Sequence, residues 1–260
     1  MNDNNRVALI TGAGSGIGKA AALRLARAGV RIGALSRTRE ELEQTVAEVE
    51  AAGSEGMVLV ADIADAEAMA AAVEALVARW GRLDVLFANA GINGVWAPID
   101  ELSPEEWRQT IDVNLNGTFL TVRYAVPHLK ERGGSVIITS SVNGTRVFSN
   151  SGASAYSATK AAQLALGKML ALELAEHNIR VNVICPGAIE TQIEENTEAR
   201  DLEEAREPVE FPAGRIPLTD GEPGTAQQVA ELVFFLASPA ASHITGTPVW
   251  IDGGESLLQG

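Results

Sequence analysis

Short, continuously apolar runs alternate along the chain with longer stretches whose apolar residues recur at helical spacing. The runs cover residues 6–11, 30–36, 56–62, 84–90, 134–140, 179–185 and 247–252. Strands that are apolar at successive positions are typical of a parallel sheet covered on both faces, because neither face meets water. Strands that alternate with helices are joined by right-handed crossovers. The pattern therefore predicts an α/β fold of three layers, in which a doubly wound sheet of seven parallel strands lies between two layers of helices.

The composition gives no sign of a second domain. Hydrophobic residues make up 46% and charged residues 21% of the 260 residues, which is ordinary for a globular protein. No repeat or low-complexity segment interrupts the chain, so we expect one domain over residues 1–260. One long connection, residues 191–224, is acidic at first and then rich in Pro and Gly. It follows a strand at the edge where α/β sheets bind ligands, which favours a substrate lid over a solvated surface helix and loop.

Charge and cysteine content argue against several functional classes. The net charge of −14 disfavours a nucleic-acid partner, since binding a polyanion requires clustered Lys and Arg. The chain has no long apolar run and no secretory signal at residues 1–11, so we expect no membrane partner and a cytoplasmic location. The single cysteine, Cys185, is expected to be a buried strand thiol. The three histidines lie in different elements, with no cysteine or carboxylate cluster, and we expect no metal site.

A cluster of glycines follows the first strand and opens a helix. It consists of Gly12, Gly14, Gly16 and Gly18. The absence of Cβ atoms lets the backbone approach a pyrophosphate, and the helix N-terminus offers unpaired N–H groups and a positive dipole end. This position between a strand and an amphipathic helix predicts a dinucleotide site.

The residues after the second strand bear on which dinucleotide binds. An acidic residue there would bind the ribose 2′-hydroxyl of NAD. The chain instead has Ser36, Arg37, Thr38 and Arg39, with no carboxylate. The guanidinium of Arg37 would hold a 2′-phosphate, so NADP(H) is favoured and NAD(H) remains possible. The alternative is that Arg37 and Arg39 are solvated residues of the next helix.

Tyr156 and Lys160 stand four residues apart in a helical stretch, so their side chains share one face. Neither group is a useful acid or base at neutral pH on its own. A nearby ammonium favours the tyrosinate, so we expect Lys160 to lower the pKa of Tyr156 and make its hydroxyl a usable proton donor or acceptor. The alternative is an interfacial tyrosine beside a solvated lysine.

Taken together, these motifs resemble the short-chain dehydrogenase/reductase family, whose fold is of the Rossmann type. The resemblance covers nearly the whole chain and depends on the joint order of its motifs. They are the glycine pattern from Thr11 to Gly18, Asn89-Ala90-Gly91, Tyr156-x-x-x-Lys160, Pro186-Gly187, Thr245-Gly246 and Asp252-Gly253-Gly254.

The resemblance implies a catalytic set and a set of cofactor contacts. In the family the tyrosine exchanges a proton with the substrate, the lysine also holds the nicotinamide ribose, and the asparagine holds a water that leads to the lysine. The catalytic residues implied are Asn114, Ser141, Tyr156 and Lys160. The cofactor contacts implied are Gly12, Ser15, Gly16, Ile17, Gly18, Ser36, Arg37, Asp62, Ile63, Asn89, Ala90, Gly91, Tyr156, Lys160, Pro186, Gly187, Ile189 and Thr191.

The serine and the asparagine of this set each raise a question of local structure. A hydroxyl at the end of the fifth strand would stabilise the substrate oxygen as it gains charge. The family's serine usually stands two residues closer to the tyrosine than Ser141 does, which we interpret as an insertion within residues 145–154, with Ser140 as the competing candidate. Asn114 lies in a helical stretch beside Asn116 and Gly117, all poor helix formers, which predicts a kink or π-bulge rather than a regular helix.

The expected activity is hydride transfer between NADP(H) and a carbonyl or secondary alcohol, with Tyr156 as general acid and base. The chain resembles bacterial 3-oxoacyl-[acyl-carrier-protein] reductases and the sugar or polyol dehydrogenases. An acidic carrier protein should dock on basic residues beside the active-site entrance, for which the chain offers Lys130 and Arg132 before the fifth strand. Glu173, Glu176 and the net charge of −14 disfavour such docking. A small free ketone, sugar or hydroxy compound is therefore the favoured substrate, with the acyl-carrier-protein reductase as the alternative.

Two other functions are disfavoured. A non-catalytic, cofactor-binding regulator is a remote alternative, and enoyl reduction is disfavoured because relatives that perform it place the lysine further along the helix.

The helix of Tyr156 has more apolar residues than one buried stripe requires. These are Leu164, Leu166, Met169, Leu170 and Leu174. Family members form tetramers through this helix and the one carrying Asn114, so we expect a homotetramer or a dimer.

Overall fold

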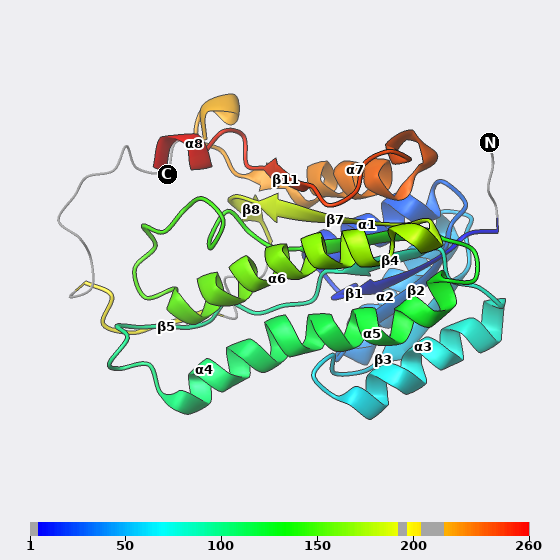
Figure 1. Ribbon diagram of the computed structural model, residues 1–260, viewed down its shortest axis with the longest axis horizontal. Coiled ribbons are helices and arrows are strands. Elements are labelled where there is room, and N and C mark those ends of the chain that lie inside the picture. The colour runs from blue at the N-terminus through cyan, green and yellow to red at the C-terminus, as the bar shows by residue number, and fades with distance from the viewer. Residues whose placement is uncertain (1–4, 192–196, 204–215, 260) are drawn as a thin grey trace.

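The computed structural model describes residues 5–191, 197–203 and 216–259 and has three layers, α/β/α (Figure 1). Its central sheet has seven strands in the order β11-β7-β6-β4-β1-β2-β3, and every neighbouring pair is parallel. The strands are β1 (Val7–Thr11), β2 (Arg31–Ser36), β3 (Gly56–Val60), β4 (Val85–Ala88), β6 (Gly134–Thr139), β7 (Ile179–Pro186) and β11 (Pro248–Ile251). The predicted doubly wound sheet and its seven strands are confirmed.

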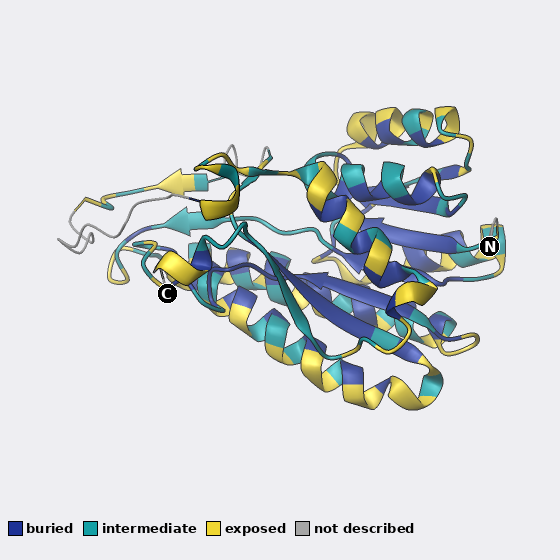
Figure 2. Ribbon diagram, turned by 90° about the horizontal axis from the view of Figure 1, so that it is seen from above, coloured by how far each residue is buried: buried dark blue, intermediate teal, exposed yellow. Residues whose placement is uncertain are grey.

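Three long helices cover each face of the sheet. One face is covered by α1 (Gly16–Ala26), α2 (Arg39–Ala51) and α7 (Ala226–Ala237), and the other by α3 (Ala66–Trp80), α5 (Gly117–Leu129) and α6 (Ser154–Glu173). Successive side chains of a strand point to opposite faces. Ala8 and Ile10 of β1 accordingly pack under α1, whereas Val7 and Leu9 pack under α3. Buried strands therefore lie between helices that are exposed only on their outer sides (Figure 2).

The helix that carries Asn114 is interrupted as predicted. It runs as α4 (Pro104–Ile111), a π-helical turn (Asp112–Asn116) and then α5. Hydrogen bonds in a π-helix span five residues instead of the four of an α-helix, so the backbone groups around Asn114 leave the regular hydrogen-bond pattern. The sequence prediction of a kink or π-bulge at this position is thus confirmed.

Two small sheets join the connection after β7 to the rest of the fold, and neither was predicted. In one, β5 (Gly94–Trp96) pairs in parallel with β9 (Thr197–Ala199), and in the other β8 (Ile189–Glu190) pairs with β10 (Gly224–Thr225). The remaining short elements are the 3-10 turns Ala175–His177, Pro217–Thr219 and Pro239–Ala241, and α8 (Ser256–Gln259). Of the predicted lid at 191–224, residues 192–196 and 204–215 lie outside the described part of the chain. Among the described helices, none combines the length and apolar character that a bilayer crossing requires.

Candidate active site

A cavity of about 580 Å³ opens at the carboxyl edge of the sheet, where the strand order reverses between β1 and β4. Such a reversal leaves a crevice in which α/β sheets bind ligands. All the predicted catalytic and cofactor-contacting residues line this cavity, except Gly18 and Asn114. The structure therefore places at one edge residues that are scattered along the sequence, while their individual roles stay predictions.

The glycine loop leaves the N-terminus of α1 open to the cavity. Gly12 has a φ of +68°, and a Cβ there would lie 3.0 Å from Nδ2 of Asn89. A Cβ on Gly18 would overlap the carbonyl of Gly12, so the loop can pass over the first turn of α1 only with glycine at that position. The N-cap residue Ser15 makes no side-chain hydrogen bond to the helix. The first N–H groups of α1 thus remain unpaired at the positive end of the helix dipole, where they can bind a pyrophosphate. The loop therefore fits a dinucleotide.

Hydrogen bonds fix the floor of the cavity across three strands. The hydroxyl of Thr11, at the end of β1, accepts bonds from the backbone N–H groups of Asn89 at 3.0 Å and Ala90 at 3.1 Å. Nδ2 of Asn89 donates to the Thr11 carbonyl at 3.2 Å, and the Thr139 hydroxyl donates to Oδ1 of Asn89 at 3.1 Å. The turn after β4 is therefore held to β1 and β6, which limits movement of the residues around the cavity.

Tyr156 and Lys160 project from one face of α6 toward the end of β6. They are only 8% and 3% exposed. Nζ of Lys160 donates to the carbonyl of Thr139 at 3.0 Å and lies 5.4 Å from the ring centroid of Tyr156. The shared helix face that the spacing predicted is confirmed. A buried phenol and ammonium next to a cavity are suited to proton transfer.

The pKa of Tyr156 departs from the prediction in direction. Burial raises the pKa above its ordinary value of 10.0, and a hydrogen bond with Ser141 opposes this only in part. The expected lowering by Lys160 is wrong for the groups of this chain, because burial is the largest cause of the shift and the ammonium is directed at the Thr139 carbonyl. Burial also lowers the pKa of Lys160 itself from 10.5 to about 8. The phenol is therefore held in its protonated form at neutral pH.

The two candidate serines have different surroundings. The side chain of Ser141 is hydrogen-bonded to that of Tyr156, and its Oγ accepts a bond from the backbone N–H of Asn143 at 3.1 Å. Ser140 instead donates its hydroxyl to the Lys160 carbonyl at 2.7 Å, which anchors α6 to the end of β6. The geometry thus places Ser141, and not Ser140, beside the phenol.

Asn114 is fully buried and holds the turn after β4 against α6. Its Nδ2 donates to the Ile92 carbonyl at 2.9 Å and to the Thr159 hydroxyl at 3.2 Å, and its Oδ1 accepts from the Ile92 N–H at 2.8 Å. Its own carbonyl accepts bonds from the Thr118 hydroxyl and from Nε2 of Gln163, both at 2.7 Å. The π-helical turn is what brings this side chain to Ile92. The water that the resemblance assigns to Asn114 stays a prediction.

Cys185 lies fully buried in β7, as predicted from its place in an apolar run. Burial raises the pKa of its thiol from 9.0 to about 11, although Lys160 and neighbouring hydroxyls oppose the shift. The thiolate is the reactive form of cysteine. Cys185 is therefore part of the wall behind Lys160 rather than a nucleophile.

Several lining residues escaped the sequence analysis. Trp96 of β5 faces Tyr156, with ring centroids 6.3 Å apart at a tilt of 41°. Asn93 lines the same region and donates to the Thr197 hydroxyl of β9 at 2.7 Å. Glu41, in the first turn of α2, lines the end of the cavity near Arg37. No local pattern marks these positions, because each reaches the cavity through contacts between distant segments.

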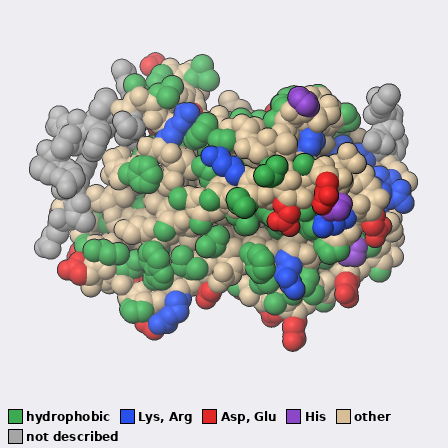
Figure 3. Space-filling model, viewed as in Figure 1, with side chains coloured by type: hydrophobic (Ala, Val, Ile, Leu, Met, Phe, Trp, Pro, Cys, Tyr) green, Lys and Arg blue, Asp and Glu red, His purple; other side chains and the backbone are tan. Residues whose placement is uncertain are grey.

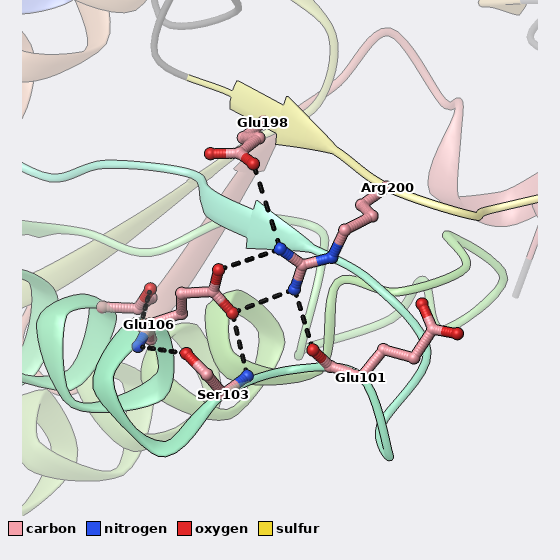
Figure 4. A network of polar contacts seen from close by, with 6 residues as sticks. Glu101, Ser103, Glu106, Glu198 and Arg200 are labelled. Atoms are coloured by element: carbon pink, nitrogen blue, oxygen red, sulfur yellow. Dashed lines mark hydrogen bonds and ion pairs between the residues drawn. The ribbon is translucent and has the colours of Figure 1, made fainter.

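An ion pair links Arg200, the residue after β9, to Glu106 of α4 (Figure 4). Both terminal nitrogens of Arg200 donate to the carboxylate of Glu106 at 3.0 Å, and one also donates to the Glu101 carbonyl at 2.8 Å. Glu106 is in addition the partner of Ser103 in the capping box of α4. The bond from Arg200, followed by those from Ser103, lowers the pKa of Glu106 from 4.5 to about 2. Residues 197–203 of the predicted lid are thus linked to α4 by a charged pair that persists over the physiological pH range.

The face formed by α5 and α6 carries exposed apolar side chains (Figure 3). Met169 and Leu172 of α6 are 69% and 83% exposed, and Phe119 of α5 is 48% exposed. Leu174, which the sequence analysis assigned to this surface, is instead buried in the core. Exposed apolar area on adjacent helices is typical of a surface that contacts another protein.

Lys130 precedes β6 and therefore lies at the amino edge of the parallel sheet, opposite the cavity. Arg132 shares this position. The expectation that these two cations flank the entrance is not met within the chain. A carrier protein that docked on them would contact the edge of this chain away from its own cavity.

Comparisons with known proteins find relatives over nearly the whole chain. Residues 12–256 match the family described as enoyl-(acyl carrier protein) reductase. A crystal structure of a 3-ketoacyl-ACP reductase from Sinorhizobium meliloti 1021 is 56% identical, with a TM-score of 0.92 over 97% of this chain and 99% of that one. Cyclohexanol dehydrogenase from an Acinetobacter species is 41% identical over 96% of this chain and 94% of its own. A Brucella melitensis 3-ketoacyl-(acyl-carrier-protein) reductase solved with NADH is 32% identical, with a TM-score of 0.84 over 96% and 98% of the two chains.

Proposed function

Because the chain belongs to the short-chain dehydrogenase/reductase family, and is an oxidoreductase of that family, we propose that it catalyses the interconversion of a small carbonyl compound and its secondary alcohol, with NADP(H) as the favoured cofactor. The observation that carries the proposal is the buried group of Tyr156, Ser141 and Lys160 beside the nucleotide cavity. The bound nicotinamide would supply or accept the hydride.

In reduction, Tyr156 donates its phenolic proton to the substrate oxygen. The phenol holds its proton at neutral pH, which is the form a donor requires, and its raised pKa means that Lys160 must stabilise the developing tyrosinate as the proton leaves. Ser141, hydrogen-bonded to Tyr156, would donate its own hydroxyl to the same oxygen as that oxygen gains charge. Lys160 would hold the nicotinamide ribose, and its ammonium would favour the tyrosinate that remains after proton transfer.

The cofactor preference depends on Arg37. Its side chain lines the end of the cavity beside Ser36 and Thr38, where the adenosine ribose would lie. A guanidinium there would pair with a 2′-phosphate. The relative solved with NADH supports binding of a nicotinamide dinucleotide in general.

The substrate is proposed to be a small ketone, sugar or hydroxy compound. Trp96 and Tyr156 form an aromatic wall, and the amides of Asn93 and Asn143 add polar groups to it. The name of the cyclohexanol dehydrogenase relative supports a small cyclic alcohol or ketone. Reduction of a 3-oxoacyl-[acyl-carrier-protein] is the second candidate, favoured by the 56% identity to the Sinorhizobium structure. Enoyl reduction is disfavoured by the four-residue spacing of Tyr156 and Lys160.

Two structural features are proposed together with this activity. The chain forms one domain in which residues 191–224 act as a substrate lid, supported by the anchoring of β9 through Arg200. It also forms a homotetramer or dimer through the apolar α5–α6 face, supported by the exposure of Met169 and Leu172.

The activity is tested by following NADPH oxidation with a panel of cyclic ketones, keto sugars and 3-oxoacyl thioesters, with NADH in parallel. Turnover of a free ketone or sugar, faster than that of the thioesters, is the expected result. Faster turnover of 3-oxoacyl-[acyl-carrier-protein] than of every free compound would select the second candidate. Absence of oxidation with all carbonyl compounds and both cofactors would contradict the proposed function.

A further inference from the structure

The structure brings a carboxylate to the part of the cavity near the end of β2, where residues 36–39 of the sequence contain none. Glu41 stands in the first turn of α2, and it lines the cavity together with Ser36, Arg37 and Thr38. A Cβ placed on Gly14 would overlap Oε2 of Glu41 and would lie 3.3 Å from the hydroxyl of Ser36. The carboxylate is thus directed at the backbone of the glycine loop and toward the end of β2.

Within the described residues, the carboxylate of Glu41 has no cation attached, whereas those of Glu43 and Glu48 on the same helix do. Glu43 pairs with Arg39 at 3.7 Å, and Glu48 pairs with Lys19 at 2.8 Å. Within the described residues, Glu41 forms no ion pair, and neither does Arg37, so these two charges do not neutralise each other. A negative and a positive group therefore face the same end of the cavity, each available to a ligand.

Local structure explains how the exposed side chain of Glu41 reaches this place. An acidic residue in the first turn of a helix is stabilised by the positive end of the helix dipole. The missing side chain of Gly14 supplies the space into which the carboxylate extends, since a Cβ at residue 14 would displace it. The position and direction of the Glu41 carboxylate thus follow from α2 and the glycine loop together.

The chemistry of the adenosine ribose distinguishes the two charges. A 2′-hydroxyl donates a hydrogen bond that a carboxylate accepts strongly, whereas a 2′-phosphate has only acceptor oxygens and carries negative charge. Given the proposed function, we propose that Glu41 accepts a hydrogen bond from the ribose 2′-hydroxyl of NAD(H) and so limits the preference for NADP(H) that Arg37 provides. The protein accordingly uses both cofactors, and Glu41 is a determinant of their ratio.

The test compares Glu41→Gln with Glu40→Gln. Glu40 is exposed, stands one residue away on the same helix and does not line the cavity, so its substitution makes the same change in net charge outside the site. Dissociation constants for NADH and NADPH are measured by titrating each protein and following nicotinamide fluorescence. This readout requires no substrate, and circular dichroism establishes that each variant is folded.

For Glu41→Gln we expect the ratio of the NADH to the NADPH dissociation constant to rise about tenfold. The 2′-phosphate of NADPH is no longer repelled by the carboxylate, and the 2′-hydroxyl of NADH loses a charged hydrogen-bond acceptor. For Glu40→Gln the ratio should stay within about twofold, because a solvated charge outside the cavity is screened. An unchanged ratio in Glu41→Gln, or equal changes in both variants, would overturn the assignment while leaving the proposed function intact. A wild-type protein that binds neither cofactor would overturn both.

Discussion

Nζ of Lys160 donates a hydrogen bond of 3.0 Å to the carbonyl of Thr139, in a position where the lysine is only 3% exposed. Burial lowers the pKa of the ammonium from 10.5 to about 8. In the unfolded chain the same group titrates near ~10.4. Between pH 8 and 10 the unfolded state therefore binds more protons than the folded state, and the contribution of Lys160 to folding stability rises with pH.

The first prediction uses Lys160→Met, which keeps the length of the side chain and removes the titration. We expect the free energy of unfolding of the wild type to gain about 1 kcal/mol relative to the variant between pH 7.5 and 9. Burial raises the pKa of Cys185 from 9.0 to about 11 and also raises that of Tyr156, so these two groups lower stability only above about pH 9. Urea unfolding at several pH values measures this, and a difference that is constant over the range would contradict the buried, charged lysine.

The second prediction concerns the π-helical turn. Asn114→Ala removes the side chain that bonds both backbone groups of Ile92, and we expect a loss of about 2 kcal/mol in the free energy of unfolding. Asn116→Ala is the matched control, because Asn116 lies in the same turn but bonds only to the exposed Asp112. The control should change stability by less than about 0.5 kcal/mol. Equal losses in the two variants, measured by chemical denaturation, would show that Asn114 has no special structural role.

The third prediction concerns the anchor of β9. Glu106→Gln keeps an acceptor for the capping box of α4 but removes the charge that pairs with Arg200. We expect faster hydrogen exchange of the Arg200 N–H, which bonds to the Trp96 carbonyl at 2.9 Å, together with a severalfold higher KM and a nearly unchanged kcat. Loosening β9 alters the wall that meets the substrate without touching Tyr156.

Glu105→Gln provides the control for this anchor, because Glu105 pairs with Arg108 on the surface of the same helix and does not reach β9. Exchange of residues 197–203 should be the same in this variant and in the wild type. It should also be insensitive to pH between 5 and 8 apart from the intrinsic exchange rate, since the pKa of Glu106 is lowered to about 2 and the ion pair stays intact. Equal protection of Arg200 in both variants would contradict an anchoring role for Glu106.

The sheet and the glycine loop could be predicted because their signals are local. Each core strand is a short apolar run, and the interruption at Asn114 follows from poor helix formers in an otherwise helical stretch. The pairing of β5 with β9 could not be predicted, since it joins segments about 100 residues apart and each strand is only three residues long. Trp96 reaches the site through this pairing.

Two electrostatic features also could not be predicted from the sequence. Glu41 lies five residues after Ser36, and only the packing of α2 against the glycine loop turns its carboxylate toward Gly14. The pKa of Tyr156 was predicted in the wrong direction because spacing reveals the neighbouring cation but not the depth of burial. Desolvation depends on the complete fold, and at this site it is the largest cause of the shift.

Substitution of Tyr156 with Phe tests the central claim most directly, because it removes only the phenolic hydroxyl and keeps the ring that faces Trp96. The measurements are the dissociation constant for NADPH and the turnover of the best carbonyl substrate in the same preparation. The account predicts an almost unchanged dissociation constant and a loss of turnover of about 10²- to 10⁴-fold, the usual contribution of a general acid. Turnover that stays within tenfold of the wild type, with cofactor still bound, would contradict proton transfer by Tyr156.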